Sequence, residues 1–233
     1  YGRPVVSTPE LAAMVFIAEL GSMHKGIEAL AYEMGRRAKM SGADAVKFQF
    51  GWPEGAGPIR RWAEANAKLI RGWCDYFDIQ FGASVFSWGG LATAESCGVD
   101  YLKMAHPETF ARNAPFENYE KILHLCLQSG KPLYVSGSSA PGAVSLYCVP
   151  KYPVYQEELQ LPMRFSSLWW GGYSSHTHGI EDALVAIGRG ATVIEKHVTL
   201  DKTEESIKDN QFALSFEEFA EMVHIGRAMS RLT

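Results

Sequence analysis

The sequence has no long hydrophobic run, few cysteines and little net charge. None of its apolar stretches approaches the roughly 18–20 residues that a membrane-spanning helix needs, so we expect no membrane partner. With 22 basic and 26 acidic side chains the formal charge is −4, which argues against nucleic acid as a partner. The 4 cysteines form no CxxC pair, so we expect reduced thiols, as in a cytoplasmic protein.

Apolar residues, in contrast, are plentiful. Hydrophobic residues make up 47% and aromatic residues 12% of the 233, enough for a sizeable core, which excludes disorder as the main state. Short runs rich in β-branched and aromatic residues alternate with longer amphipathic segments. The runs predict eight strands: Val15–Leu20, Ala45–Phe50, Gln80–Val85, Tyr101–Met104, Pro132–Ser136, Val144–Val149, Gly171–Ser175 and Ala191–Val198.

This alternation predicts a single α/β domain over residues 1–233, a (β/α)8 or TIM barrel, for which about 250 residues is usual. An open doubly wound sheet is the alternative, weakened because no GxGxxG follows the first strand. Apolar stripes predict helices over Ile27–Ala38 and Ile59–Trp73, the second interrupted at Asn66, and a capping box at 215–218 opens the last helix. Between Ser136 and Val144 the chain is too short for a helical crossover, so either the barrel lacks a helix there or residues are missing from the sequence.

Several polar residues interrupt the predicted strands, where buried parallel strands should be almost continuously apolar. Side chains alternate along a strand, so Glu195 and His197 share a face while Lys196 takes the other. Most of these residues lie toward the carboxyl ends of their strands, where barrel enzymes carry their active sites. We therefore expect the following side chains to converge on one mouth of the barrel: Glu19, Lys47, Gln49, Lys103, Ser174, His176, Glu195 and His197.

The chemistry of this set is informative. Two lysines with neighbouring hydroxyls suit a phosphate or a carboxylate. Two neutral imidazoles with oxygen ligands suit a divalent metal such as Mn²⁺, Zn²⁺ or Fe²⁺. Glu19 and Glu195 are candidates for acid–base work beside them. Any one of these residues could serve a structural network instead, but their convergence favours a functional site.

The polar residues of the strands belong to longer motifs, which occur in this order: Phe16-Ile-Ala-Glu-Leu20, His24-Lys-Gly26, Gly42-Ala-Asp-Ala-Val-Lys-Phe-Gln49, Tyr101-Leu-Lys103, Lys131-Pro-Leu-Tyr-Val-Ser136, Cys148-Val-Pro-Lys-Tyr-Pro153, Gly172-Tyr-Ser-Ser-His-Thr177 and Ile194-Glu-Lys-His-Val-Thr-Leu-Asp-Lys202. Through these motifs the chain resembles, from Phe16 to Arg227, the sialic acid (N-acetylneuraminate) synthase family, which is built on a barrel.

The resemblance implies a transferase that forms a C–C bond between phosphoenolpyruvate and an N-acyl hexosamine, such as N-acetylmannosamine or a diacylated relative, for surface polysaccharide such as that of spore coats. It implies catalytic roles for Glu19 and Glu195, a divalent metal (Mn²⁺ or Mg²⁺) on His176 and His197, and a homodimer. It also implies that the substrates contact Lys47, Gln49, Ser84, Lys103, His106, Glu108, Ser136, Tyr152, Ser174 and Asp209.

The sequence departs from the family pattern at Met23, His106, Pro150 and Ser175. We expect the antifreeze-like domain that follows the barrel in this family to be absent, because the sequence stops at Thr233. Two alternatives stay open. One is another metal-dependent aldol-type lyase or synthase on the same barrel, and the other is a non-catalytic barrel that binds a sugar or a partner protein.

Overall fold

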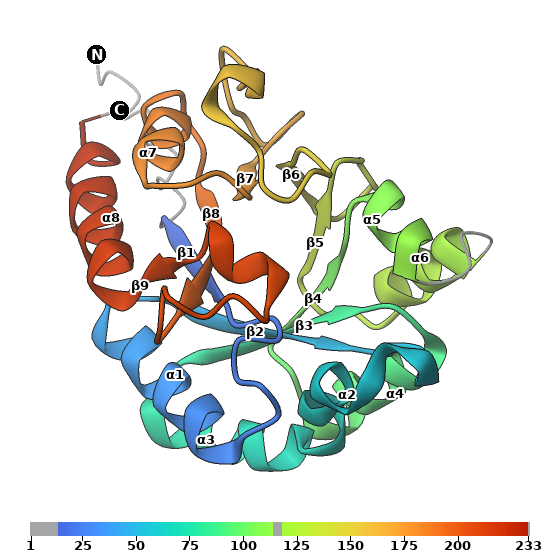
Figure 1. Cartoon of the computed structure of the whole chain (residues 1–233). Helices are drawn as coiled ribbons and strands as arrows, with labels where there is room; N and C mark the ends of the chain where they lie inside the picture. Colours follow the sequence, from blue (N-terminus) through green and yellow to red (C-terminus); the bar gives the residue numbers. More distant parts are fainter. Residues whose placement is uncertain (1–13, 114–117, 233) are drawn as a thin grey trace, which may run out of the picture.

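In the computed structural model, which describes residues 14–113 and 118–232, parallel strands form a closed barrel (Figure 1). Neighbouring strands pair in sequence order, and β1 pairs with β8 to close the sheet. This closure confirms the TIM barrel and excludes the open sheet. The strands are β1 Val15–Glu19, β2 Ala45–Phe50, β3 Gln80–Val85, β4 Tyr101–Met104, β5 Leu133–Ser136, β6 Val144–Tyr147, β7 Gly172–Ser175 and β8 Val193–Thr199, with a short β9 at Leu214–Ser215 beside β8.

Helices surround most of the barrel. The stripe predicted over residues 59–73 is divided between two helices at Asn66, whose side-chain amide donates 2.8 Å to the Trp62 carbonyl. The predicted capping box is confirmed: the Ser215 hydroxyl accepts from the Glu218 N–H and opens α8. The helices are α1 Glu28–Met40, η1 Glu54–Ala56, α2 Gly57–Ala65, α3 Ala67–Phe77, α4 Trp88–Cys97, α5 Pro107–Asn113, α6 Tyr119–Gln128, η3 Gln156–Glu158, α7 Glu181–Gly188, η4 Lys208–Gln211 and α8 Phe216–Met229.

The connection between β5 and β6 contains no helix (Figure 1). Residues 137–143 return from the end of one strand to the start of the next through a turn, and β5 still pairs with β6 in parallel. The given sequence therefore closes the barrel without a helix at this position. The β6–β7 connection holds only the short η3, which the sequence did not predict. No helix in the described ranges is long and apolar enough to cross a membrane.

The barrel interior is built in layers, and the lower layer is apolar. A small core cluster of Ile17, Ala45, Tyr101, Leu146 and Val193 fills the amino-terminal half of the barrel. Each of these residues stands two positions before an inward-facing residue near the mouth, because side chains alternate along a strand. Gly82 belongs to the same layer, since a Cβ there would lie 1.9 Å from the Tyr101 ring. The polar residues of the strands therefore form the floor of whatever opens at the carboxyl end.

The described cysteines are all free and buried, as predicted. His124 and His224 lie on helices α6 and α8, outside the strands of the barrel.

Candidate active site

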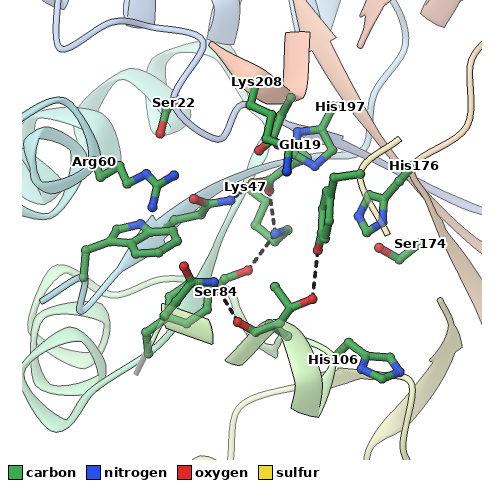
Figure 2. Close-up of a pocket in the computed structure, with 18 of the residues that line it drawn as sticks. Glu19, Ser22, Lys47, Arg60, Ser84, His106, Ser174, His176, His197 and Lys208 are labelled. Carbon is green, nitrogen blue, oxygen red and sulfur yellow. Dashed lines mark hydrogen bonds and ion pairs between the residues drawn. The ribbon is translucent and has the colours of Figure 1, made fainter. Parts of the chain in front are cut away.

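A pocket of about 420 Å³ opens at the carboxyl ends of the strands, where the sequence placed the site (Figure 2). His176 and His197 lie on one side of the pocket, and Arg60 lies on the opposite side. The residues predicted from the sequence that line the pocket are Glu19, Lys47, Gln49, Ser84, Lys103, His106, Ser136, Tyr152, Ser174, His176, Glu195, His197 and Asp209. Glu108 is not among the lining residues: its side chain is 63% exposed, and its carboxylate pairs with Arg112 at 3.3 Å.

The floor of the pocket is a chain of alternating charges carried by four strands. Lys47 Nζ lies 2.5 Å from a Glu19 oxygen and 3.7 Å from Glu195 Oε1. Lys103 Nζ also contacts Glu195 Oε1, so Glu195 lies between two lysines. All four residues are buried. Two acids and two bases balance in charge, which is how such charges can be kept out of water.

Hydroxyl and amide groups complete this chain. Lys47 donates 2.6 Å to the Ser84 hydroxyl, and Lys103 donates 3.1 Å to that of Ser174. Ser174 in turn donates 3.0 Å to Glu195, while the Gln49 amide donates 2.7 Å to Glu19. Each lysine thus holds an ion pair and a serine on the pocket floor. A phosphate or carboxylate entering here meets two ammonium groups with hydroxyl donors beside them.

The two glutamates differ in proton affinity because their surroundings differ. Burial opposes ionisation of Glu195, but the nearby Lys103 and Lys47 outweigh it and hold its pKa at about 2. For Glu19 burial outweighs the attraction of Lys47, and its pKa is raised above the ordinary value. Two carboxylates whose environments push their pKa values apart are suited to different roles: Glu195 stays ionised, and Glu19 takes up a proton more readily.

His176, which directly follows β7, and His197, on β8, lie beside each other on one side of the pocket, with ring centroids 5.7 Å apart. Burial lowers the pKa of both, that of His197 to about 4, so both imidazoles are neutral near pH 7. His176 Nδ1 lies 3.2 Å from the Val149 carbonyl, and because a carbonyl only accepts, this nitrogen carries the proton and Nε2 keeps its lone pair. The Tyr152 ring packs against the His176 ring, with centroids 4.1 Å apart and planes tilted by 32°.

These imidazoles fit a divalent metal as an open site with two nitrogen ligands. His197 Nδ1 is buried and has no hydrogen-bond partner in the part of the chain that the structure describes. Gly21 keeps room beside it, since a Cβ there would lie 3.6 Å from His197 Nδ1 and 3.5 Å from Glu19 Oε1. Among the described residues, no group of three or more His, Cys, Asp or Glu is gathered for a metal, so the remaining ligands would be oxygens of substrate or water.

Opposite the carboxyl end of β5, His106 follows β4 and packs directly over Gly137. Its Nδ1 accepts 3.2 Å from the Glu108 backbone N–H, so the ring proton is on Nε2. Burial lowers the pKa of His106, which keeps the ring neutral and leaves it a hydrogen-bond donor at Nε2. The buried Ser136 hydroxyl lines the same side of the pocket.

Sequence reasoning missed the residues of the rim that come from loops and helices. The Arg60 guanidinium lies 4.6 Å above the Trp52 ring, which stacks on Phe86 at 4.5 Å. Thr109 holds the Tyr152 hydroxyl at 3.1 Å. The one sequence signal for these residues is their position just after the ends of β2, β3 and β4. The missed lining residues include Trp52, Arg60, Phe86, Thr109, Arg112, Cys148 and Lys208.

Comparison with known proteins places this chain in a family. The model of the NeuB family matches residues 117–233. Pseudaminic acid synthase of Campylobacter jejuni is 29% identical over 89% of this chain and 71% of its own length, and N,N'-diacetyllegionaminic acid synthase of Legionella pneumophila is 30% identical over 80% and 64%. The crystal structure of N-acetylneuraminic acid synthetase from Leptospira borgpetersenii, in complex with citrate, has the same fold, with a TM-score of 0.76 and 24% identity over 94% of this chain and 85% of that one. The chain belongs to the NeuB family.

Proposed function

We propose that the chain is a synthase that condenses phosphoenolpyruvate with an N-acyl hexosamine to give a nine-carbon sugar acid and phosphate. The observation that carries the proposal is the charge-balanced Glu–Lys chain on the pocket floor, facing two neutral imidazoles at the same barrel mouth. Its relatives in the NeuB family include synthases of pseudaminic and diacetyllegionaminic acid, which agrees with this class of product. We also propose that the protein is a cytoplasmic homodimer that acts in surface polysaccharide synthesis.

Phosphoenolpyruvate, the donor substrate, would bind in the part of the pocket that Lys47 and Lys103 line. Lys47 and Lys103 offset the charges of its phosphate and carboxylate, and the hydroxyls of Ser84, Ser136 and Ser174 donate to their oxygens. His106 adds an N–H donor on the β4 side. When Lys47 and Lys103 bind these oxygens, their ion pairs with Glu19 and Glu195 weaken. Both carboxylates can then interact with the substrates.

The reaction balances with groups already in the pocket. The methylene carbon of the donor attacks the sugar aldehyde, a C–C bond forms, and the aldehyde oxygen takes a proton. Water then adds to the enol-phosphate carbon and returns a proton to Glu19. The C–O bond to phosphate breaks as the new hydroxyl becomes the ketone, and the proton of that hydroxyl leaves with the phosphate. Glu19, whose pKa is raised by burial, is placed to supply the first proton, while ionised Glu195 stabilises the positive charge on the enol-phosphate carbon.

A divalent cation, Mn²⁺ or Mg²⁺, would be held by His176 and His197, the two imidazoles that present lone pairs to the pocket. When bound, such an ion polarises a carbonyl oxygen and fixes its orientation. Tyr152 orients His176 by packing against its ring, and Gln49 and Asp209 line the space beside the imidazoles, where the sugar hydroxyls would lie.

Phosphate release tests the proposal. The protein is incubated with phosphoenolpyruvate and Mn²⁺ while N-acetylmannosamine and diacylated hexosamines are supplied in turn. We expect sugar-dependent release that is lost in His176→Ala and kept in His124→Ala, a matched histidine on the exposed face of α6. Absence of release and of phosphoenolpyruvate binding would refute the proposal. Consumption of an aldehyde with no phosphate released would favour the aldol-type alternative. The departures from the family pattern at His106 and Pro150 agree with that alternative.

A further inference from the structure

A second polar cluster lies behind the site, on the outer face of β7 and β8, and the reaction does not use it. Because side chains alternate along a strand, Ser175 and Lys196 point away from the barrel while their neighbours His176 and His197 point into it. The cluster consists of Ser175, Thr177, Asp182 and Lys196. All four residues are buried, with Lys196 and Thr177 at 0% exposure.

Asp182, in the first turn of α7, is the centre of this cluster. Its carboxylate accepts from the Ser175 hydroxyl at 2.5 Å and from the Thr177 hydroxyl, and its other oxygen lies 3.0 Å from Lys196 Nζ. Lys196 also donates 2.9 Å to the Thr177 carbonyl and 3.2 Å to the Thr177 hydroxyl. The pair therefore contacts both residues that flank His176, and Lys196 itself stands between Glu195 and His197.

Stability alone does not require a charged pair at this place. The other buried residues of α7 are Ala183, Ala186 and Ile187, which pack in the ordinary apolar way. A buried ion pair is often no more stabilising than apolar side chains of similar volume, because both charges lose their hydration. What an ion pair with several hydrogen bonds adds is direction, since its partners must keep fixed distances and angles.

We propose that Asp182 and Lys196 form a positioning pair that sets the distance and orientation of His176 relative to His197. The inference rests on the metal site of the proposed function. The pair joins β7 to β8 from outside the barrel, through Ser175, Thr177 and Lys196, which are the chain neighbours of the two histidines between which a bound ion would lie. Loss of such outer contacts typically weakens metal binding 10–100-fold.

The experiment measures Mn²⁺ affinity by the electron paramagnetic resonance signal of the free ion, with the unfolding midpoint recorded for every variant. Asp182→Asn keeps the shape of the side chain but removes the charge. The double variant Asp182→Leu/Lys196→Met removes both charges, leaves net charge unchanged, and lets the hydroxyls of Ser175 and Thr177 bond to each other, as they already do at 3.1 Å. Asp44→Asn is the control, because Asp44 pairs with Arg227 at 2.7 Å at the other end of the barrel.

We expect the double variant to unfold close to the wild-type midpoint and still to bind Mn²⁺ 10–100-fold more weakly, whereas Asp44→Asn lowers the midpoint and keeps wild-type affinity. If the double variant has both the wild-type unfolding midpoint and the wild-type affinity for Mn²⁺, the pair is only structural and the inference is wrong. If Asp182→Asn fails to fold, Ser175→Ala, which removes one hydrogen bond to Asp182, replaces it in this comparison.

The metal and the chemistry are tested separately. The inference is wrong if the wild-type protein binds no Mn²⁺, or if the His176→Ala variant binds Mn²⁺ as tightly as the wild type. If Mn²⁺ binds through His176 and binds more weakly in the double variant, but the protein neither releases phosphate with any sugar nor binds phosphoenolpyruvate, the proposed function fails and the positioning pair stands.

Discussion

Replacing Gly137 with alanine tests the part of the pocket in which we propose that phosphoenolpyruvate binds. Gly137 follows Ser136 at the end of β5 and has a φ of +69°, in the region that favours glycine. A Cβ at this position would lie 1.8 Å from His106 Cδ2 and 2.4 Å from His106 Nε2. Gly137→Ala therefore cannot be accommodated unless the His106 ring moves.

The matched control lies in the same connection. Gly142 has a φ of +82°, and a Cβ there would meet nothing within 4 Å. Both substitutions carry the backbone cost of alanine in the left-handed region, about 1–2 kcal/mol. Only Gly137→Ala also displaces His106. If His106 donates to the phosphate, losing this charge-assisted hydrogen bond costs about 1.5–3 kcal/mol, which is roughly a 10- to 100-fold higher KM for phosphoenolpyruvate.

The assay is sugar-dependent phosphate release as a function of phosphoenolpyruvate concentration, with urea denaturation run in parallel. Gly142→Ala should lower stability and leave the KM unchanged, while Gly137→Ala should raise the KM as much as His106→Ala does. The double variant Gly137→Ala/His106→Ala should be no worse than either single change, because both act through the same ring. Equal KM values for Gly137→Ala and Gly142→Ala would refute the assignment of His106 to the phosphate.

Three further predictions follow from the pocket. Lys103→Met leaves buried Glu195 with Lys47 alone, so the free energy of unfolding at pH 7 should fall by about 3–5 kcal/mol in urea titrations, and an unchanged value would contradict the ion-pair chain. The pKa of Glu195, about 2 in the folded protein against an ordinary 4.5, means that its stabilisation is present above pH 4.5 and lost as the pH falls toward 2. Melting curves of Glu195→Gln should therefore lie below those of the wild type at neutral pH and converge with them in acid; a gap that persists at the lowest pH would count against this. Arg60 is a cation that lies across the pocket from the imidazoles, so Arg60→Ala should raise the KM of phosphoenolpyruvate more than that of the sugar, and the opposite pattern would place Arg60 beside the sugar.

The barrel and its floor were predictable from the sequence because both depend on strand periodicity. Buried parallel strands leave nearly continuous apolar runs, so their positions are conspicuous, and polar interruptions two residues apart, such as Lys47 and Gln49, point to one face. The rim was not predictable. Trp52 and Arg60 come from a loop and from α2, and their meeting over the pocket depends on the path between the elements, which has no period.

Helix boundaries and the reach of single side chains were also beyond the sequence. The stripe over residues 59–73 keeps its phase across Asn66, so the break there is set by the local amide contact and not by the apolar pattern. The resemblance placed Glu108 among the substrate contacts, yet in the first turn of α5 its side chain is exposed and its carboxylate pairs with Arg112. One helical turn decides whether a residue faces a pocket or water, and residue spacing alone does not fix that turn.

The alternating chain of Glu19, Lys47, Glu195 and Lys103 has a consequence for anion selectivity. The two carboxylates already serve as counterions, so an incoming anion binds by exchange and must compete with groups tethered at high local concentration. A small anion such as chloride can replace one oxygen of one carboxylate and gains little. An anion with two charged ends reaches both lysines at once, which lets the pocket discriminate among the anions of the cell with no steric gate.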